Sequence, residues 1–505
     1  MKTRREFLQL GCAALIGMST KSDRRIAGGW VNDNSNAGHA IRDRVGLPTP
    51  SRTEKVSLVI VGGGIAGLSA AWRLQKRGFR DFVLLEMNDS AGGNARSGEN
   101  EVSAYPWAGH YVPVPGSKAV YVRELFEDLG VLQNGVWNER YLCFAPQERL
   151  FTYGKWQDGI EPAVGLSTRD REQFTKLEQL FSAHRTGGAF TIPMELGLSE
   201  KSAELDKISF ADWLRQNAID SPQVLWYMNY CCRDDYGATA AETSAWAGVH
   251  YFASREPEEK GPITWPEGNG WITKRLLQTV GAYVRVNQPV RHIARDKTKY
   301  VITTGDTQFL CDGVIFAAPT FLAPYIVEGF APLPTFEYSP WLTANLTLDR
   351  SPRGASTDER AWDNVVMHSP TLGYVDATHQ TLRTHVERTV WTFYWALAEG
   401  SAKDNRRLLL DKDWNYWKEA ILSDLERVHP DIRDCVSRID LMRMGHAMAR
   451  PSVGAIFDSD RRRLAQSSGR LLFANSDLSG FSIFEEAQYR GVHAAEQLLR
   501  ALGKS

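Results

Sequence analysis

Residues 56–67 read VSLVIVGGGIAG, and this stretch decides the fold of the 505-residue chain. Its first half is a short apolar, β-branched run of the kind that forms a buried parallel strand. Its second half satisfies the spacing G-x-G-x-x-G and continues into residues 68–74, whose apolar positions recur at helical spacing. A second apolar run, 82–85, ends in Glu86, about 20 residues after the glycines. This order of strand, glycine turn, helix, strand and acid predicts an α/β fold with a Rossmann-like domain.

Each part of this unit has a physical role in binding a dinucleotide. Gly62 makes the tight turn, Gly64 lets the backbone approach a pyrophosphate, and Gly67 lets the helix pack on the strand. The helix N-terminus offers unpaired N–H groups and a positive dipole end to the phosphates. Glu86 accepts hydrogen bonds from ribose hydroxyls and would repel a 2′-phosphate. The predicted dinucleotide contacts are Gly62, Gly64, Ile65, Ala66, Gly67 and Glu86.

A second glycine turn, Gly92-Gly93-Asn94-Ala95-Arg96, follows the second strand. With this turn the sequence resembles the flavin-containing amine oxidoreductases, the family of monoamine and polyamine oxidases, protoporphyrinogen oxidase and phytoene desaturases. The resemblance implies that FAD is the cofactor, with Gly92 and Gly93 wrapping its diphosphate and Arg96 as the charge-assisted partner. An enzyme that uses NAD alone has no need of this second turn.

Two later regions extend the resemblance to about residue 500. Strands are expected at 283–290, 300–303 and 312–319, and in the family the first of them places a valine backbone against adenine, best matched here by Val290. The segment 469–477, GRLLFANSD, precedes a helix expected at 485–499. In the family these elements hold the flavin and its ribityl chain. Asn475-Ser476 stands where one glycine is usual, so either Ser476 or Asp477 could meet the cofactor.

The resemblance also implies the domain organisation. It predicts a glutathione-reductase-like FAD-binding domain built from three separated segments, interleaved with a mixed-sheet substrate domain. The expected ranges are a leader at 1–30, a linker at 31–53, the FAD-binding domain at 54–135, 260–330 and 440–505, and the substrate domain at 136–259 and 331–439. Apolar periodicity predicts helices at 120–129, 169–182, 210–217 and 413–428.

Candidate substrate-side residues come from the positions that the family places before the flavin. His110 lies in the aromatic stretch 105–111 and could orient a substrate or accept a proton, since its reference pKa is near neutrality. Trp107 lies in the same stretch, and Phe484 or Phe481 could form one wall of an aromatic cage. Glu485 or Glu486 could attract a cation, although acids in a first helical turn also serve ordinary capping. The candidate catalytic residues are His110, Phe484, Trp107 and Glu485.

Two departures from the family pattern bear on the chemistry. Family oxidases usually carry a lysine that holds a water near the flavin, but the comparable stretch, 339–349, has none. The stretch 450–454 also lacks the cysteine that some members link to the flavin. We therefore expect non-covalent FAD and favour a dehydrogenase over an oxygen-consuming oxidase. The electron acceptor stays open between a quinone or cytochrome-like partner and oxygen.

The N-terminus resembles a twin-arginine signal. Arg4-Arg5 precedes Phe7-Leu8 and an apolar run, 8–18, which is too short to span a bilayer and suits a signal peptide. We expect the twin-arginine translocation machinery to be a partner and the periplasm to be the destination. This route suits cargo that folds around a cofactor before export. The alternative is a disordered basic terminus.

The amino-acid composition argues against several other classes of protein, namely nucleic-acid-binding, metal-binding and haem proteins. The formal net charge of −1 gives no electrostatic case for nucleic acid as a partner. Six cysteines without CxxC or CxxCH spacing argue against a zinc site, an iron–sulfur cluster or c-type haem, so we expect no metal. The adjacent pair Cys231-Cys232 could be two buried thiols or a strained disulfide.

Three functions remain open on the sequence. The leading one is FAD-dependent oxidation of a C–N bond in an amine, a class that includes polyamines. The second is desaturation or aromatisation of an apolar substrate. The third is a flavin-bound maturation or scaffold protein in the periplasm that has no turnover.

Overall fold

The apolar run expected at 56–61 forms strand β3 (Leu58–Val61), and all four of its residues are buried. Successive side chains of a strand point to opposite faces, and here both faces are covered. Leu58 and Ile60 pack into a cluster with helices, whereas Val59 and Val61 pack into a second cluster on the other face. This double burial explains why the run is continuously apolar rather than alternating.

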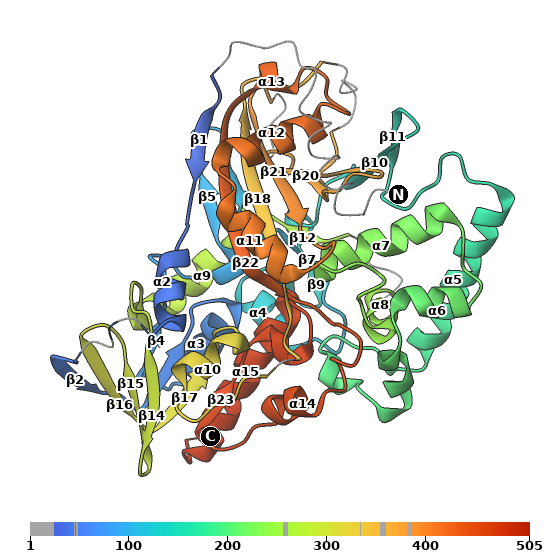
Figure 1. Ribbon diagram of the computed structural model, residues 1–505. Helices are drawn as coiled ribbons and strands as arrows, with labels where there is room; N and C mark the ends of the chain where they lie inside the picture. The colour runs from blue at the N-terminus through green and yellow to red at the C-terminus, as the bar shows by residue number, and fades with distance from the viewer. Residues whose placement is uncertain are drawn as a thin grey trace.

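The computed structural model describes residues 25–44, 46, 49–255, 261–333, 335–353, 360–381 and 386–504 (Figure 1). β3 is central in a five-stranded parallel sheet. Its strand order is β13 (Val284–Arg285), β4 (Phe82–Leu85), β3, β17 (Gly313–Phe316) and β23 (Leu471–Phe473). The twin-arginine motif lies outside the described residues.

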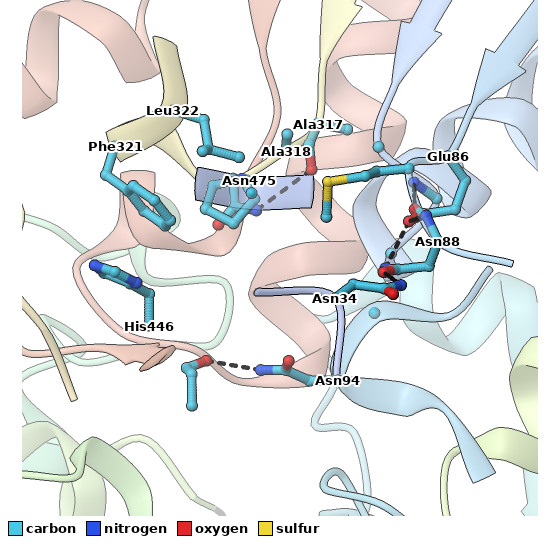
Figure 2. A pocket seen from close by; sticks show the side chains of 18 of the residues that line it. Asn34, Glu86, Asn88, Asn94, Ala317, Ala318, Phe321, Leu322, His446 and Asn475 are labelled. Atoms are coloured by element: carbon cyan, nitrogen blue, oxygen red, sulfur yellow. Dashed lines mark hydrogen bonds between the residues drawn. The ribbon is translucent and has the colours of Figure 1, made fainter. Parts of the chain in front are cut away.

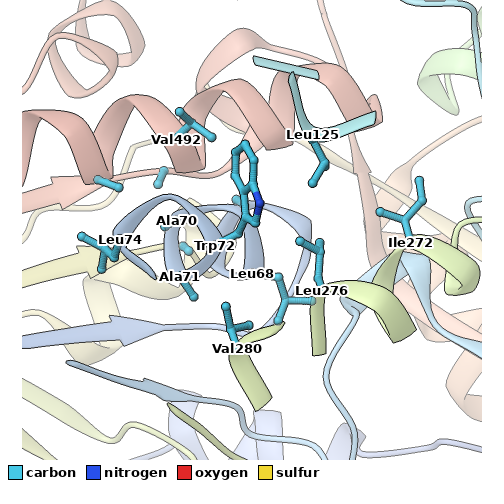
Figure 3. Packing of buried hydrophobic residues seen from close by; sticks show 14 of the residues in the cluster. Leu68, Ala70, Ala71, Trp72, Leu74, Leu125, Ile272, Leu276, Val280 and Val492 are labelled. Carbon is cyan, nitrogen blue, oxygen red and sulfur yellow. The ribbon is translucent and has the colours of Figure 1, made fainter. Parts of the chain in front are cut away.

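Helices cover one face of this sheet (Figure 3). α3 (Ile65–Lys76) follows the glycine turn and packs through Leu68 and Leu74 between its neighbours. Its partners are the long C-terminal helix α15 (Phe484–Ala501), α9 (Gly270–Val280) and α4 (Val120–Asp128). The N-terminus of α3 is thereby held rigidly at the carboxyl ends of the parallel strands.

A four-stranded sheet covers the other face. Its strand order is β14 (His292–Asp296), β15 (Lys299–Thr303), β16 (Thr307–Cys311) and β2 (Arg52–Lys55). Phe309 and Cys311 of this sheet pack on Val59 and Val61 of β3. The helices, the parallel sheet and the second sheet form three layers, as we expected for the dinucleotide-binding domain.

The second large unit is built on an eight-stranded mixed sheet. Two of its strands are long, β22 (Val436–Ala449) and β18 (Tyr338–Leu348), and they run antiparallel to each other. The full order is β1 (Ala27–Trp30), β22, β18, β21 (Thr389–Ala396), β20 (Gly373–Asp376), β19 (Asp363–Val366), β10 (Glu148–Thr152) and β11 (Lys155–Asp158).

Two groups of helices accompany this sheet (Figure 1). One packs against β18, β21 and β22 and comprises α11 (Ala402–Asp411), α12 (Trp414–Leu425) and α13 (Ile432–Cys435). The other has its own apolar cluster and comprises α5 (Thr168–Thr186), α6 (Phe210–Gln216), α7 (Pro222–Tyr236) and α8 (Ala245–Ala253). No helix within the described residues is both long enough and apolar enough to cross a membrane.

The remaining elements are short. Three are helices: α2 (Ser35–Arg42), α10 (Ala323–Ile326) and α14 (Ser459–Ala465). The others are two-stranded pairs: β5 (Ser97–Glu99) with β6 (Ala104–Pro106), β7 (Tyr111–Val112) with β12 (Ile263–Thr264), and β8 (Leu132–Gln133) with β9 (Val136–Trp137).

The four predicted helices are confirmed as α4, α5, α6 and α12, and the predicted C-terminal helix is α15. The linker expected at 31–53 is wrong, because that range contains α2 and the start of β2. β1 also begins at Ala27, inside the range expected for the leader. Such short elements have little periodicity of their own, and their partners lie hundreds of residues away in the chain. The boundary expected at 440 falls within β22.

Candidate functional site

A cavity of about 610 Å³ opens where the parallel sheet meets β22 and α15. The carboxyl ends of parallel strands are the usual ligand site of such sheets. Its wall includes most of the predicted dinucleotide contacts: Gly62, Gly64, Ile65, Ala66, Glu86, Gly92, Gly93, Arg96, Val290 and Ser476. Residues that are more than 400 positions apart in the sequence therefore share one wall.

Two glycines of the first turn, Gly62 and Gly67, have no room for a side chain. Gly62 has a φ of +102°, and a Cβ there would lie 2.9 Å from the backbone nitrogen of Ala318. A Cβ on Gly67 would lie 1.9 Å from the carbonyl oxygen of Gly62. Gly67 is not on the cavity wall, and its part is to let α3 approach the turn.

Glu86 organises the end of the cavity beyond β4. Its Oε2 accepts a 2.7 Å hydrogen bond from the backbone N–H of Gly63. Its Oε1 accepts 2.8 Å bonds from both the backbone and the side-chain nitrogen of Asn88. The carboxylate thus joins the glycine turn to the segment after β4, and it faces the cavity (Figure 2).

The structure distinguishes Ser476 from Asp477, the two residues that the sequence left as alternatives for contacting the cofactor. Ser476 lies on the cavity wall. Asp477 does not, because its carboxylate accepts hydrogen bonds from the backbone and hydroxyl of Thr320 and from the hydroxyl of Tyr338, each at 2.7 Å. Asp477 therefore ties the end of β23 to the start of β18 and presents no side chain to a cofactor.

Several of the predicted substrate-side residues lie at the start of α15, and they differ in whether they face the cavity. Phe484 lies on the cavity wall and stacks on Phe126. Glu485 is buried in the first turn but is not on that wall. Glu486 accepts hydrogen bonds from the backbone of Met194 and the hydroxyl of Ser479. Of the predicted cage residues near this helix, only Phe484 faces the cavity.

His110 and Trp107 lie in different surroundings despite their closeness in sequence. Trp107 is buried, makes an edge contact with Tyr105 and packs in a separate apolar cluster. It is not on the cavity wall. His110 directly follows Gly109, which is on the wall, and its Nδ1 lies 3.2 Å from the carbonyl oxygen of Ala108.

Around His110 the fold assembles an aromatic cluster that the sequence did not predict. His110 stacks on Tyr394 with ring centres 4.7 Å apart and lies 5.0 and 5.4 Å from the rings of Tyr111 and Trp362. The Tyr394 hydroxyl donates to the carbonyl oxygen of Ala108. Burial lowers the pKa of His110 to about 4, so its imidazole is neutral at ordinary pH. We call His110, Tyr111, Trp362 and Tyr394 the aromatic cluster.

Carboxylates stand next to the aromatic cluster. We call Glu148, Asp234, Asp235 and Asp363 the acidic group. Glu148 and Asp363 are register partners on parallel strands, and Asp234 and Asp235 lie in the last turn of α7. Burial and the neighbouring carboxylates of Asp235 and Glu148 raise the pKa of Asp234 to about 7. The pKa of Asp363 is raised well above its usual range by burial, and then by Glu148 and Asp234.

Two further observations describe the surroundings of these clusters. Asp235 accepts a 3.3 Å hydrogen bond from Arg255, so this carboxylate has a cationic partner. Ala447 belongs to the same apolar cluster as Trp362 and Tyr394 and also lies on the cavity wall. Part of the aromatic cluster therefore packs in the same apolar cluster as a residue of the cavity wall.

The sequence also missed His446, on β22. It lies on the cavity wall and stacks on Phe321, with ring centres 4.2 Å apart (Figure 2). Burial lowers its pKa to about 4. No local motif marks this position, since only the pairing of β22 with β18 brings it to the cavity. The cysteines Cys143, Cys231, Cys232, Cys311 and Cys435 are free and buried, and none is on the cavity wall.

The comparison with known protein families identifies the family of this chain. Residues 65–499 match the family described as "Flavin containing amine oxidoreductase". The chain belongs to this family. It is 22% identical over 399 residues to the probable flavin-containing monoamine oxidase A of Dictyostelium discoideum, covering 72% of this chain and 81% of that protein.

Solved structures agree with the family. The wild-type putrescine oxidase bound to putrescine superposes with a TM-score of 0.68 and 17% identity, covering 89% of this chain and all of that one. The cyclohexylamine oxidase of Brevibacterium oxydans gives the same TM-score and coverage at 16% identity. At these identities the likeness shows the fold, which is the FAD-binding and mixed-sheet arrangement expected from the sequence.

The cavity of this amine oxidoreductase fits the FAD that the family implies. Arg96 Nη1 is buried and has no hydrogen-bond partner within the part of the chain that the structure describes. Burial lowers the pKa of this guanidinium, and its Nε donates to the carbonyl oxygen of Gly93. An unpaired buried donor is costly, and a diphosphate is an acceptor of the right charge. The two glycine turns, Arg96 and Glu86 would hold the cofactor.

Proposed function

We propose that this FAD-dependent amine oxidoreductase oxidises a C–N bond of an amine that carries a second cationic group, as diamines and polyamines do. The observation that carries the proposal is the acidic group beside the aromatic cluster. Burial, and then these carboxylates, raise the pKa of Tyr111 and Tyr394, and Tyr394 packs in the same apolar cluster as Ala447 of the cavity wall. FAD, when bound, supplies the acceptor for the hydride. The chain's own residues collect, orient and desolvate the amine.

The aromatic cluster is suited to bind the reacting amine group of such a substrate. Aromatic faces attract ammonium groups, and the rings of Tyr394, Trp362 and Tyr111 surround His110. Hydride loss requires an unprotonated nitrogen, and a buried apolar surrounding favours the neutral form of an amine. The neutral His110 can accept a hydrogen bond at Nε2 when Nδ1–H donates to Ala108. We assign it to orient the amine, with water as the proton acceptor.

The acidic group is suited to bind the second, distal cationic group of the substrate. Glu148, Asp234 and Asp363 lie together, and the mutual repulsion of their carboxylates contributes to the raised pKa of Asp234 and Asp363. A cation bound among them would relieve this repulsion and return their pKa values towards normal. Putrescine, the ligand in the putrescine oxidase structure, is such a doubly charged amine.

An anaerobic bleaching assay tests the proposal. We expect a diamine to reduce the bound flavin faster at low concentration than a monoamine of equal length, and neutral analogues to leave it oxidised. Asp363→Asn should remove the preference for the diamine without stopping monoamine reduction. If a carotenoid-like or porphyrinogen substrate bleaches the flavin while every amine fails, the function is desaturation or aromatisation. If no compound bleaches the flavin, the result favours the third function, a flavin-bound maturation or scaffold protein without turnover.

The mode of cofactor attachment and the acceptor are part of the same proposal. Because no cysteine is on the cavity wall, we propose non-covalent FAD that is released into the supernatant on acid precipitation. No lysine occurs between Lys299 and Lys403, so none lies on β18 to hold a water at the flavin. This supports a dehydrogenase with a quinone or cytochrome-like acceptor. Rapid reoxidation by oxygen in stopped-flow mixing would instead identify an oxidase.

Export of the folded enzyme to the periplasm by the twin-arginine machinery completes the proposal. Its support is the Arg4-Arg5 motif with the apolar run after it, together with a cofactor cavity that closes only in the folded protein.

A further inference from the structure

The segment before the first dinucleotide strand bridges the two large units. We call residues 27–42, from β1 through α2, the N-terminal strap. β1 pairs in parallel with β22 at the edge of the eight-stranded sheet, and Val31 N–H donates to the carbonyl oxygen of Leu441. Figure 1 shows β1 along the outer edge of that sheet and α2 at its junction with the FAD-binding domain.

Side chains anchor the strap to β22. The guanidinium of Arg443 lies over the ring of Trp30, 4.7 Å from its centre. The same group makes an ion pair with Asp33, with Nε 3.1 Å from Oδ2. Both partners of this pair are partly buried, with side-chain exposures of 17% for Arg443 and 25% for Asp33. Such shielding makes the pair stronger than an open surface salt bridge.

The other end of the strap packs on the FAD-binding domain. Ile41 is 5% exposed and lies in the apolar cluster that contains Val61 and Leu85, the last residues of β3 and β4. Arg291 donates a 3.2 Å hydrogen bond to the carbonyl oxygen of Ala40. The strap therefore crosses the cavity from one unit to the other.

Between its anchors the strap forms part of the cavity wall. Asp33, Asn34, Ser35, Gly38, His39, Ile41 and Arg42 all line it. Asn34 Nδ2 donates a 2.6 Å hydrogen bond to Asn88 Oδ1, and Asn88 in turn donates twice to Glu86 (Figure 2). The acid after the second strand of a dinucleotide fold is the residue that binds the adenosine ribose.

We infer that Asn34 is a positioning residue for FAD and that the N-terminal strap closes over the adenosine end of the cofactor. Asn34 donates to Asn88 Oδ1 and so holds the Asn88 side-chain amide with its Nδ2 directed at Glu86 Oε1, which helps to fix the direction of the Glu86 carboxylate. The strap must then fold after the dinucleotide enters, or detach when it leaves. Any leader that is removed must also end before Ala27, because β1 belongs to the folded protein.

Matched substitutions in the purified full-length holoenzyme test this inference. Asn34→Asp keeps the side-chain shape but removes the donor to Asn88, and Asp33→Ala removes the anchor to Arg443. Asn36→Asp makes the same chemical change at an exposed position of α2 that is not on the cavity wall. We expect the first two to accelerate FAD release, followed by flavin fluorescence, about five- to tenfold, and Asn36→Asp to leave it unchanged.

Two further readouts separate positioning from general destabilisation. FMN lacks adenosine, so Asn34→Asp should weaken FAD binding to the apoprotein while leaving FMN binding unchanged. Trypsin cleavage after Arg42 or Arg44 should be slower when FAD is added to the apoprotein. The inference is overturned if Asn34→Asp releases FAD at the wild-type rate, if FMN and FAD weaken equally, or if FAD does not alter the rate of cleavage.

Discussion

Glu86 is the centre of the hydrogen-bond network at the dinucleotide end of the cavity. It accepts from Gly63 in the first glycine turn and twice from Asn88, and through Asn88 it is connected to Asn34 of the strap. One carboxylate therefore links three segments that contact the cofactor cavity. Its loss would affect both direct ribose binding and the order of these segments.

Replacing Glu86 with Ala should weaken FAD binding by about 1.5–3 kcal/mol, the usual worth of a hydrogen bond to a charged group. Titration of the apoprotein with FAD, followed by fluorescence quenching, measures the change. Glu127→Ala, at an exposed position of α4, is the matched control. Equal affinities for the two variants would show that Glu86 does not bind the cofactor.

Asp234 is the residue that should govern pH dependence. Its pKa of about 7 means that it is protonated below pH 7 and ionised above it. A bis-quaternary ammonium ligand carries charge that does not titrate, so the pH dependence of its binding belongs to the protein. We expect its affinity to rise about tenfold per pH unit as pH approaches 7 from below, and then to level off.

Binding of this ligand can be followed by the perturbation of flavin absorbance. Asp234→Asn should shift the pH profile, because the pKa of the remaining Asp363 carboxyl, which Asp234 helps to raise, then falls. Asp411→Asn, at an exposed position of α11, should leave the profile unchanged. His110, with a pKa of about 4, contributes no ionisation in this range. A profile of Asp234→Asn that matches the wild-type profile would remove Asp234 from the proposed cation site.

At the scale of elements, the packing of α15 on α3 sets the position of the cavity. Both helices present small residues where they cross: a Cβ on Gly491 of α15 would lie 2.0 Å from the carbonyl oxygen of Ala66 in α3. Ala66 and Phe484 at the helix N-termini are on the cavity wall. A change in the distance between the helices therefore moves two walls of the cofactor site at once.

Gly491→Ala should cost about 1–3 kcal/mol through overpacking and should also weaken FAD binding, since Ala66 is displaced. The midpoint of thermal unfolding and the FAD affinity would both fall. Gly281→Ala is the control, because Gly281 has a φ of −57° and no atom within 4 Å of the added Cβ. If the two variants have the same midpoint, the helix crossing is not tight.

Elements differ in how well the sequence predicted them. α3, α5 and α15 have clear periodicity or caps, and they lie close to the expected ranges. β1 reads AGGW and has no strand pattern, because its structure comes from pairing with β22. The expected strand 283–290 is reduced to Val284–Arg285, since only these residues pair with β4.

At the scale of the whole molecule, the interleaved chain makes cofactor binding and folding interdependent. The cavity wall draws on the strap, on β3 and β4, on β22 and on α15, so it is complete only when nearly the whole chain has folded. This interdependence is the physical argument for the proposed twin-arginine route, because a route that carries folded cargo would let the cofactor bind first.

Changing Arg4-Arg5 to Lys-Lys should therefore trap folded, yellow protein in the cytoplasm. Cell fractionation with flavin fluorescence of each fraction measures the distribution. A variant that lacks residues 2–24 is the control and should remain cytoplasmic in a flavin-loaded state. Periplasmic protein from the Lys-Lys variant would show that the twin-arginine assignment is wrong.

The sequence by itself determined the dinucleotide unit and the family, because a glycine turn, its flanking strands and Glu86 lie within about 30 consecutive residues and interact locally. The neutral His110, the acidic group around Asp234 and the strap residue Asn34 depended on tertiary structure. Each owes its properties to residues far away in the chain: Tyr394 stacks on His110, Glu148 repels Asp234, and Asn88 receives the Asn34 amide. Burial and proximity of this kind have no local pattern, so only the folded chain could reveal them.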